Sequence, residues 1–204
     1  MKDEKFYPNE PWGRAYLNNN SYLEFEKIVY FDKFEVAYEL LNRNIVKLTN
    51  SKDKCEYAKL LKGHTLSNVA EVYNYGKISY EQEGSKESFY YIELGYFSEN
   101  LESVNLKEEF LQVFKHCCFG EYFQHGTFQD FENCFKLGDD CSLNDIGNLI
   151  KKRLNGNDNE NLLVRMYSEF CFAYKEIYQI VPDFRLNLCD KNLNVINKHL
   201  FLMI

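Results

Sequence analysis

The sequence predicts an α+β protein in which most strands precede most helices. Short β-branched and aromatic runs, separated by turn residues, fill the chain from Tyr22 to Leu94, with a single helical pattern among them. After Gly95 the apolar residues recur mainly at helical spacing, most clearly from Leu162 to Ile180. This order predicts an antiparallel β-rich first part and a mostly helical second part.

Length and composition indicate one folded domain, or a small and a larger lobe. The 204 residues can bury a core without disulfide bonds, and a 45% hydrophobic content is too high for a disordered chain. The net charge of −7 argues against a nucleic-acid partner, because the one basic run, Lys151-Lys152-Arg153, is typical of a solvated helix end.

Several features predict a cytoplasmic protein that contacts no membrane. The 7 cysteines have no regular spacing, the first residues are charged, and no apolar run is long enough to cross a bilayer. The abundance of Asn, Lys, Tyr, Phe and Ile is typical of AT-rich genomes, such as those of a phage or a bacterium.

Residues 1–20 are expected to form a flexible arm, because they are polar and contain Pro8, Pro11 and a run of asparagines. An antiparallel meander of three strands should follow, with turns at Asp32-Lys33 and Asn42-Arg43. The three strands are predicted over residues 22–31, 34–41 and 44–48.

A helix is expected after the third strand, with Ser51 as its N-cap and Gly63 at its end. Cys55, Ala58 and Leu61 would form its apolar stripe. Further strands are predicted over residues 69–75, 77–80 and 88–94, with a hairpin loop at 81–85.

The second part should contain four helices and a closing hairpin. Pro182 would end the last helix, and Asn197-Lys198 would form the turn of the hairpin. The helices are predicted over residues 106–119, 127–137, 141–154 and 162–180, and the hairpin strands over 193–196 and 199–204.

Four segments resemble motifs of the protein kinase family. Ile45-Val46-Lys47-Leu48 resembles the third-strand motif whose lysine holds nucleotide phosphates, and Glu56 lies in the next helix, where the family places the partner of that lysine. Ile92-Glu93-Leu94-Gly95-Tyr96 resembles the last small-lobe strand and the hinge. Leu186 to Val195 resembles the catalytic loop, with Asn187 and Asn192 at the spacing of its aspartate and asparagine.

The resemblance implies a kinase-like small lobe over residues 21–97 and a truncated, mostly helical large lobe over residues 98–204. It also implies lost catalysis. Asn187 stands where the family has the aspartate that accepts the substrate proton, and no glycine lies between Tyr30 and Tyr38 to admit phosphates. The metal-binding Asp-Phe-Gly motif would follow Ile204, where the sequence ends.

We therefore expect a catalytically inactive, kinase-like binding protein, or pseudokinase, that regulates or inhibits another protein, such as a host protein met by a phage or bacterial factor. No cofactor is expected. Aromatic residues in and beside the region 101–160 are the expected contact surface, because aromatic side chains dominate protein interfaces. These residues are Tyr96, Phe97, Phe119, Tyr122, Phe123, Phe128 and Phe131.

Two other interpretations stay open. An atypical small kinase or nucleotide transferase would use Lys47, Glu56 and Asn192 with ATP and magnesium. A homo-oligomer would bury apolar surface against a second copy of the chain. Cysteines and histidines also gather between His116 and Cys141, but their irregular spacing favours buried free thiols over a zinc site.

Overall fold

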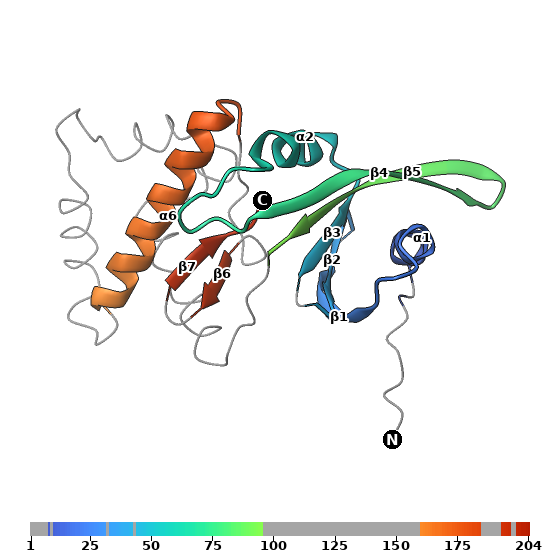
Figure 1. Ribbon diagram of the computed structural model, residues 1–204, viewed down its shortest axis with the longest axis horizontal. Coiled ribbons are helices and arrows are strands. Elements are labelled where there is room, and N and C mark those ends of the chain that lie inside the picture. Colours follow the sequence, from blue (N-terminus) through green and yellow to red (C-terminus); the bar gives the residue numbers. More distant parts are fainter. Residues whose placement is uncertain are drawn as a thin grey trace, which may run out of the picture. The chain divides into compact units, whose positions relative to one another are not determined.

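The computed structural model describes Pro8 and residues 10–31, 33–42, 44–95, 160–184, 193–196 and 199–204. Over these residues the chain is α+β, with a five-stranded antiparallel sheet, a two-stranded sheet and three helices (Figure 1). The chain divides into two compact units. The first contains Met1–His64 and Ala70–Phe97, and the second contains Thr65–Val69 and Ser98–Ile204.

The first unit is built on the five-stranded sheet, whose order is β1-β2-β3-β5-β4 with every neighbouring pair antiparallel. The predicted meander is confirmed, and α2 (Lys52–Leu61) lies in the sequence between β3 and β4. The strands are β1 (Phe25–Phe31), β2 (Glu35–Leu40), β3 (Ile45–Thr49), β4 (Val72–Gln82) and β5 (Ser85–Leu94).

β4 is one strand, so the prediction of two strands separated near Gly76 is wrong. A Cβ atom on Gly76 would lie 2.7 Å from a ring atom of Tyr91, its partner on β5. A residue without a side chain is therefore needed at position 76, because the Tyr91 ring packs directly over it. The loop is also shorter than predicted, because Glu83 and Gly84 alone connect the strands, with φ values of 51° and 79° typical of a type I′ turn.

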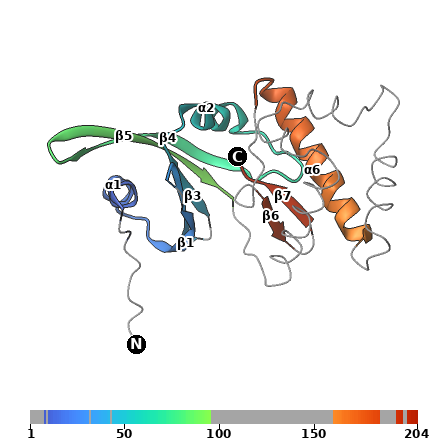
Figure 2. The same cartoon turned by 180° about the vertical axis from the view of Figure 1, so that it is seen from behind.

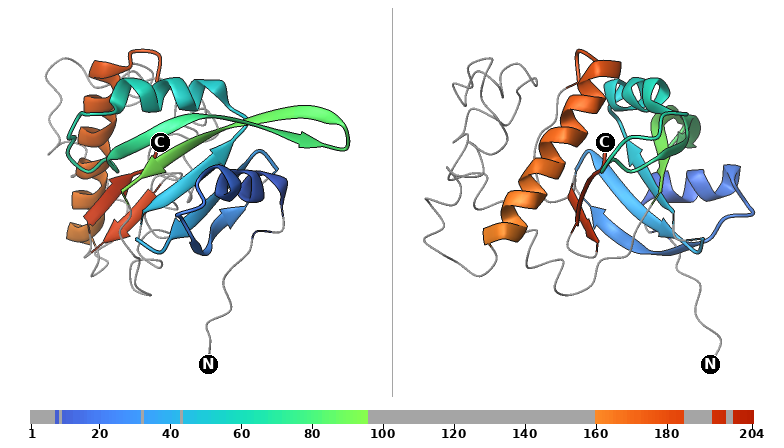
Figure 3. Two further views of the ribbon diagram at one scale, coloured as in Figure 1. Left: turned by 45° about the vertical axis from the view of Figure 1, so that its right-hand side comes forward. Right: turned by 60° about the vertical axis from the view of Figure 1, so that its left-hand side comes forward.

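The β4–β5 hairpin extends beyond the rest of the sheet (Figure 3). Only Tyr90 to Leu94 of β5 pair with β3, while the pairing with β4 continues to Ser85. Residues 78–89 therefore form a two-stranded ribbon.

A helix forms in the second half of the segment 1–20, for which a flexible arm is predicted. α1 (Pro11–Asn19) begins with Glu10 as its N-cap, and the Glu10 side chain accepts a hydrogen bond from the Gly13 amide at 3.0 Å. Proline is favoured at the first helical position, where its missing N–H costs nothing, so Pro11 starts a helix here. Ala15 and Tyr16 are buried, which ties the segment to the core.

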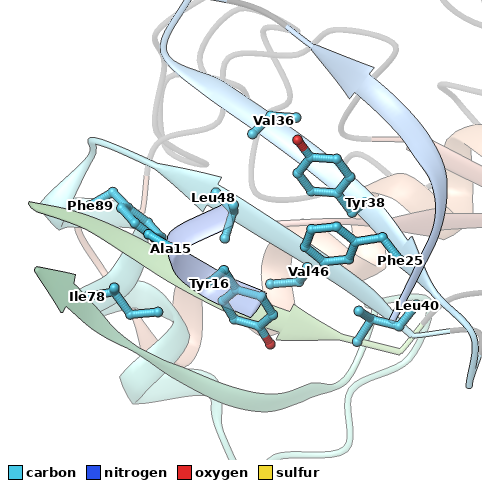
Figure 4. Close-up of a cluster of buried hydrophobic side chains, with 10 residues drawn as sticks. All are labelled: Ala15, Tyr16, Phe25, Val36, Tyr38, Leu40, Val46, Leu48, Ile78 and Phe89. Atoms are coloured by element: carbon cyan, nitrogen blue, oxygen red, sulfur yellow. The ribbon is translucent and has the colours of Figure 1, made fainter. Parts of the chain in front are cut away.

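The core of the first unit lies between α1 and one face of the sheet (Figure 4). Its aromatic rings stack closely, with centroids 4.1 Å apart for Phe25 and Tyr38 and 5.9 Å apart for Tyr16 and Phe25. The buried cluster consists of Ala15, Tyr16, Phe25, Val36, Tyr38, Leu40, Val46, Leu48, Ile78 and Phe89.

α2 lies on the opposite side of the β4–β5 hairpin from α1 (Figures 1 and 3). Ser51 caps it as predicted, because its hydroxyl accepts a hydrogen bond from the Lys54 amide at 3.4 Å. The predicted apolar stripe of Cys55, Ala58 and Leu61 is buried. The helix ends at Leu61, and Gly63 follows with a φ of 87°.

In the second unit, α6 (Glu160–Ile180) and the antiparallel pair β6 (Leu193–Ile196) and β7 (His199–Leu202) confirm the predicted helix and hairpin (Figure 2). Phe170, Tyr174 and Phe184 are buried there. Over the described residues, no helix is long and apolar enough to cross a membrane. The helices predicted over 106–119, 127–137 and 141–154 lie outside the described residues.

Candidate functional site

Lys47 occupies the middle strand of the sheet and its side chain is fully buried. Its neighbours Val46 and Leu48 face the apolar core, so strand alternation places Lys47 on the opposite face. Lys47 pairs with Ala37 of β2, and Glu35 lies two residues before Ala37 on that same face. The Lys47 Nζ and Glu35 Oε1 atoms lie 2.9 Å apart.

A second ammonium group completes this arrangement. Lys54, in the first turns of α2, contacts the other carboxylate oxygen of Glu35 and is itself partly exposed. One buried carboxylate thus bridges a lysine from β3 and a lysine from α2. We call Glu35, Lys47 and Lys54 the buried ion cluster. Each buried charge in the cluster has an oppositely charged partner, as a buried charge requires.

A neighbouring ion pair lies on the same face of the sheet. Glu39, four residues after Glu35, is buried, and its Oε2 atom is 3.0 Å from the Nζ of Lys27 on β1. That oxygen accepts no aligned hydrogen bond from the described residues. The contact is therefore Coulombic, and it holds β1 against β2 at the edge of the sheet.

The structure does not bring Glu56 to Lys47, so the pairing implied by the resemblance is wrong for these residues. The Glu56 side chain is 52% exposed and lies 3.8 Å from Lys59, one helical turn onward. The buried stripe of α2 consists of Cys55, Ala58 and Leu61, and position 56 points about 100° away from position 55. Glu35 takes the place expected for Glu56.

Glu93, in the segment that resembles a hinge, receives a hydrogen bond from α1. The Tyr16 hydroxyl donates to Glu93 Oε1 at 2.5 Å. Burial, followed by this hydrogen bond, raises the pKa of Tyr16 well above its usual range. Two residues later, the Gly95 amide donates to the Glu71 carbonyl at 2.9 Å. The C-terminal end of β5 is therefore fixed by two hydrogen bonds, one from the Tyr16 side chain of α1 and one to the Glu71 backbone.

The other predicted site residues lie outside the described residues. They are Tyr96, Phe97, Phe119, Tyr122, Phe123, Phe128, Phe131, Asn187 and Asn192, together with the cysteines and histidines between His116 and Cys141. Within the part of the chain that the structure describes, no group of three metal-binding side chains occurs.

Sequence reasoning missed Glu35 and Lys54. A signal for Glu35 exists: a hairpin centred on Asn42 places Ala37 opposite Lys47, and alternation then puts Glu35 and Lys47 on one face. No comparable signal exists for Lys54, because the position of α2 against the sheet depends on tertiary packing. In comparisons with known proteins, no family model matches the chain, and no curated protein matches it.

Proposed function

We propose that the chain is a catalytically inactive, kinase-like protein that binds another protein and regulates or inhibits it. The observation that carries this proposal is the complete burial of the Lys47 side chain inside the sheet, where it contacts Glu35. A lysine that binds nucleotide phosphates must present its ammonium group to them. Here that group is buried against a carboxylate.

The cost of moving the Lys47 ammonium group out of its buried position opposes phosphate binding. Separating one partner from a buried ion pair typically costs roughly 3–5 kcal/mol, because the other charge is left uncompensated. Glu35 is further held by Lys54, so moving Lys47 toward a phosphate would also disturb α2. The glutamate that the family would use, at position 56, faces solvent instead.

The kinase-like part of the proposal is supported by the order of elements. Three strands, a helix and two strands follow one another, as the resemblance implies, and the lysine lies on the third strand. Two sequence features oppose catalysis within that arrangement. Only residues 32–34 connect β1 to β2, and they contain no glycine, while Asn187 replaces the proton-accepting aspartate.

Protein binding is supported by apolar side chains that stay exposed at one edge of the sheet. β1 is an edge strand, and large apolar residues on it and beside it are exposed. Exposed apolar residues at a sheet edge are typical of protein contacts. They are Tyr22, Ile28, Phe31, Phe34 and Leu41.

Thermal unfolding with ATP or ADP, with and without magnesium, tests the proposal. A ligand at 100 times its dissociation constant stabilises a folded protein by about 2.7 kcal/mol, so binding would be visible. We expect no shift for the wild-type protein. A magnesium-dependent shift that Lys47→Met abolishes, while the exposed-site control Lys59→Met retains it, would instead establish the atypical kinase or transferase.

A further inference from the structure

A small pocket opens where the start of α1 meets the end of β1 and the start of β2. Its volume is about 130 Å³. Ligand pockets for drug-sized molecules are typically about 300–1,000 Å³, so this one suits a single side chain. It is lined by Glu10, Pro11, Trp12, Phe31, Lys33 and Val36.

Two aromatic residues line this pocket, and one of them is held rigidly. The Trp12 Nε1 atom donates to the Tyr80 hydroxyl at 3.1 Å, and its ring stacks on Phe89 with centroids 5.9 Å apart. Phe31, at the end of β1, is 65% exposed and therefore accessible to a ligand. Aromatic faces attract cations through their quadrupole, and tryptophan does so most strongly.

Glu10 supplies a carboxylate in the same pocket. Its Oε1 atom accepts hydrogen bonds from the Gly13 amide and from the Tyr38 hydroxyl. Its own backbone amide and the nearby Arg14 also favour the charged form of this carboxylate. Burial outweighs these contributions and raises the pKa of Glu10. A further cation in the pocket would favour the charged form of the Glu10 carboxylate.

We propose that this pocket binds a lysine or arginine side chain of the protein partner. The inference rests on the proposed function, to which it adds the chemistry that the partner must present. The ammonium or guanidinium group would lie between Trp12, Phe31 and the Glu10 carboxylate. Its aliphatic stem would pack on Pro11 and Val36. The net charge of −7 also favours the approach of a basic partner.

Lys33 opposes a bound cation because its side chain lines the same pocket. Its ammonium group lies 5.2 Å from the centroid of the Phe34 ring, so it has an aromatic partner of its own. The proposal therefore makes an unusual prediction: removing the Lys33 charge should strengthen cation binding. A merely structural role for these residues would not produce that result.

Trp12 is the only tryptophan in the chain, so indole fluorescence reports on this pocket directly. The full chain would be titrated with N-acetyl-arginine amide and N-acetyl-lysine amide at constant ionic strength. N-acetyl-norleucine amide is the uncharged control and N-acetyl-glutamate amide the anionic one. We expect a saturable change with at least one cation by about 50 mM, with arginine and lysine distinguished by their dissociation constants.

Three variants complete the test. Glu10→Gln keeps the acceptor used by Gly13 and Tyr38 but removes the charge, and should weaken cation binding about fivefold. Phe31→Leu should weaken it by a similar factor, whereas Lys33→Met should strengthen it. Circular dichroism would establish that each variant is folded, and the exposed Leu41→Ala is the control for Phe31→Leu.

Three results would overturn the inference. An equal response to the norleucine amide would mean a merely apolar pocket, and a response to the glutamate amide alone would mean an anion site at Lys33. The absence of any saturable response to either cation would exclude the site. Nucleotide titrations test the proposed function separately, because the cation titration contains no nucleotide and no Lys47 variant.

Discussion

Lys47 of β3 and Glu35 of β2 form a buried ion pair across two neighbouring strands, with Nζ and Oε1 2.9 Å apart. The pair exists because strand register places both side chains on the face of the sheet opposite the aromatic core. It occupies the lysine that the kinase resemblance assigns to phosphates, and Lys54 joins it to α2.

Removing either charge of this pair should destabilise the first unit strongly. Glu35→Gln leaves the buried Lys47 ammonium without its carboxylate, and Lys47→Met leaves a buried carboxylate with one fewer partner. We expect Glu35→Gln to lower the free energy of unfolding by roughly 3–5 kcal/mol, and Lys47→Met to lower it by somewhat less, because Lys54 still compensates Glu35. Urea denaturation measures this, with the exposed Glu56→Gln as the control, which should change stability by less than about 0.5 kcal/mol.

The double variant Glu35→Leu/Lys47→Met sharpens this test. Replacing both charges with apolar groups removes the uncompensated charge, so the double variant should be more stable than either Glu35→Leu or Lys47→Met alone. Strictly additive losses would show that the two side chains are not coupled.

Much of the first unit follows from local sequence patterns, while the ion pair does not. Alternating apolar residues predict β1, β2 and β3, and Ser51 predicts the start of α2, because each signal lies within a few residues. The partner of Lys47 depends on the register between strands and on the packing of α2, which are tertiary features. Glu56 was therefore assigned by resemblance, and Glu35 was missed.

The predictions at Pro11 and Gly76 are also wrong because they consider only neighbouring residues in the sequence. Pro11 indicates an irregular segment in isolation, but it starts α1 because Glu10 caps the helix and Tyr16 reaches the core. Gly76 indicates a strand end, but the Tyr91 ring on β5 requires a residue without a side chain there. In both cases a contact distant in sequence determines the local structure.

Gly76→Ala should destabilise the β4–β5 hairpin by about 1–3 kcal/mol, because the new Cβ would overlap the Tyr91 ring. The loss should shrink when Tyr91 is replaced by alanine, since the clash then disappears. A double-mutant cycle by chemical denaturation measures this coupling. Equal losses in both backgrounds would show that the close approach of Tyr91 is not the reason for glycine.

Tyr16 should make stability depend on alkaline pH. Its pKa is raised in the folded protein, chiefly by burial and then by the hydrogen bond to Glu93, so the unfolded chain loses this proton first. The contribution is complete below about pH 10, the ordinary tyrosine pKa, and is lost as the pH rises further.

Denaturation of wild type and Tyr16→Phe between about pH 8 and pH 11 would measure this dependence. The wild-type free energy of unfolding should fall more steeply than that of the variant. The variant should retain a smaller fall, since burial also raises the pKa of Tyr91. Parallel pH profiles would contradict the assignment to Tyr16.

Glu10 should make the free energy of unfolding depend on pH in the acidic range. Burial raises its pKa in the folded state, so the folded protein takes up this proton before the unfolded chain does. Wild type should therefore gain stability relative to Glu10→Gln as the pH falls from neutrality through that pKa. Denaturation of both proteins at about pH 7 and pH 4 measures the difference, and a relative loss by wild type on acidification would contradict it.

The burial of Lys47 beside Glu35 can be measured directly. Acetylation of lysines by a water-soluble reagent, followed by mass spectrometry, tests it at the residue itself. Lys47, fully buried, should react far more slowly than the 59%-exposed Lys59, at a rate that ATP and magnesium leave unchanged. A Lys47 rate comparable to that of Lys59 would show that Lys47 is not buried, and a rate that falls when ATP and magnesium are added would show that nucleotide binds there.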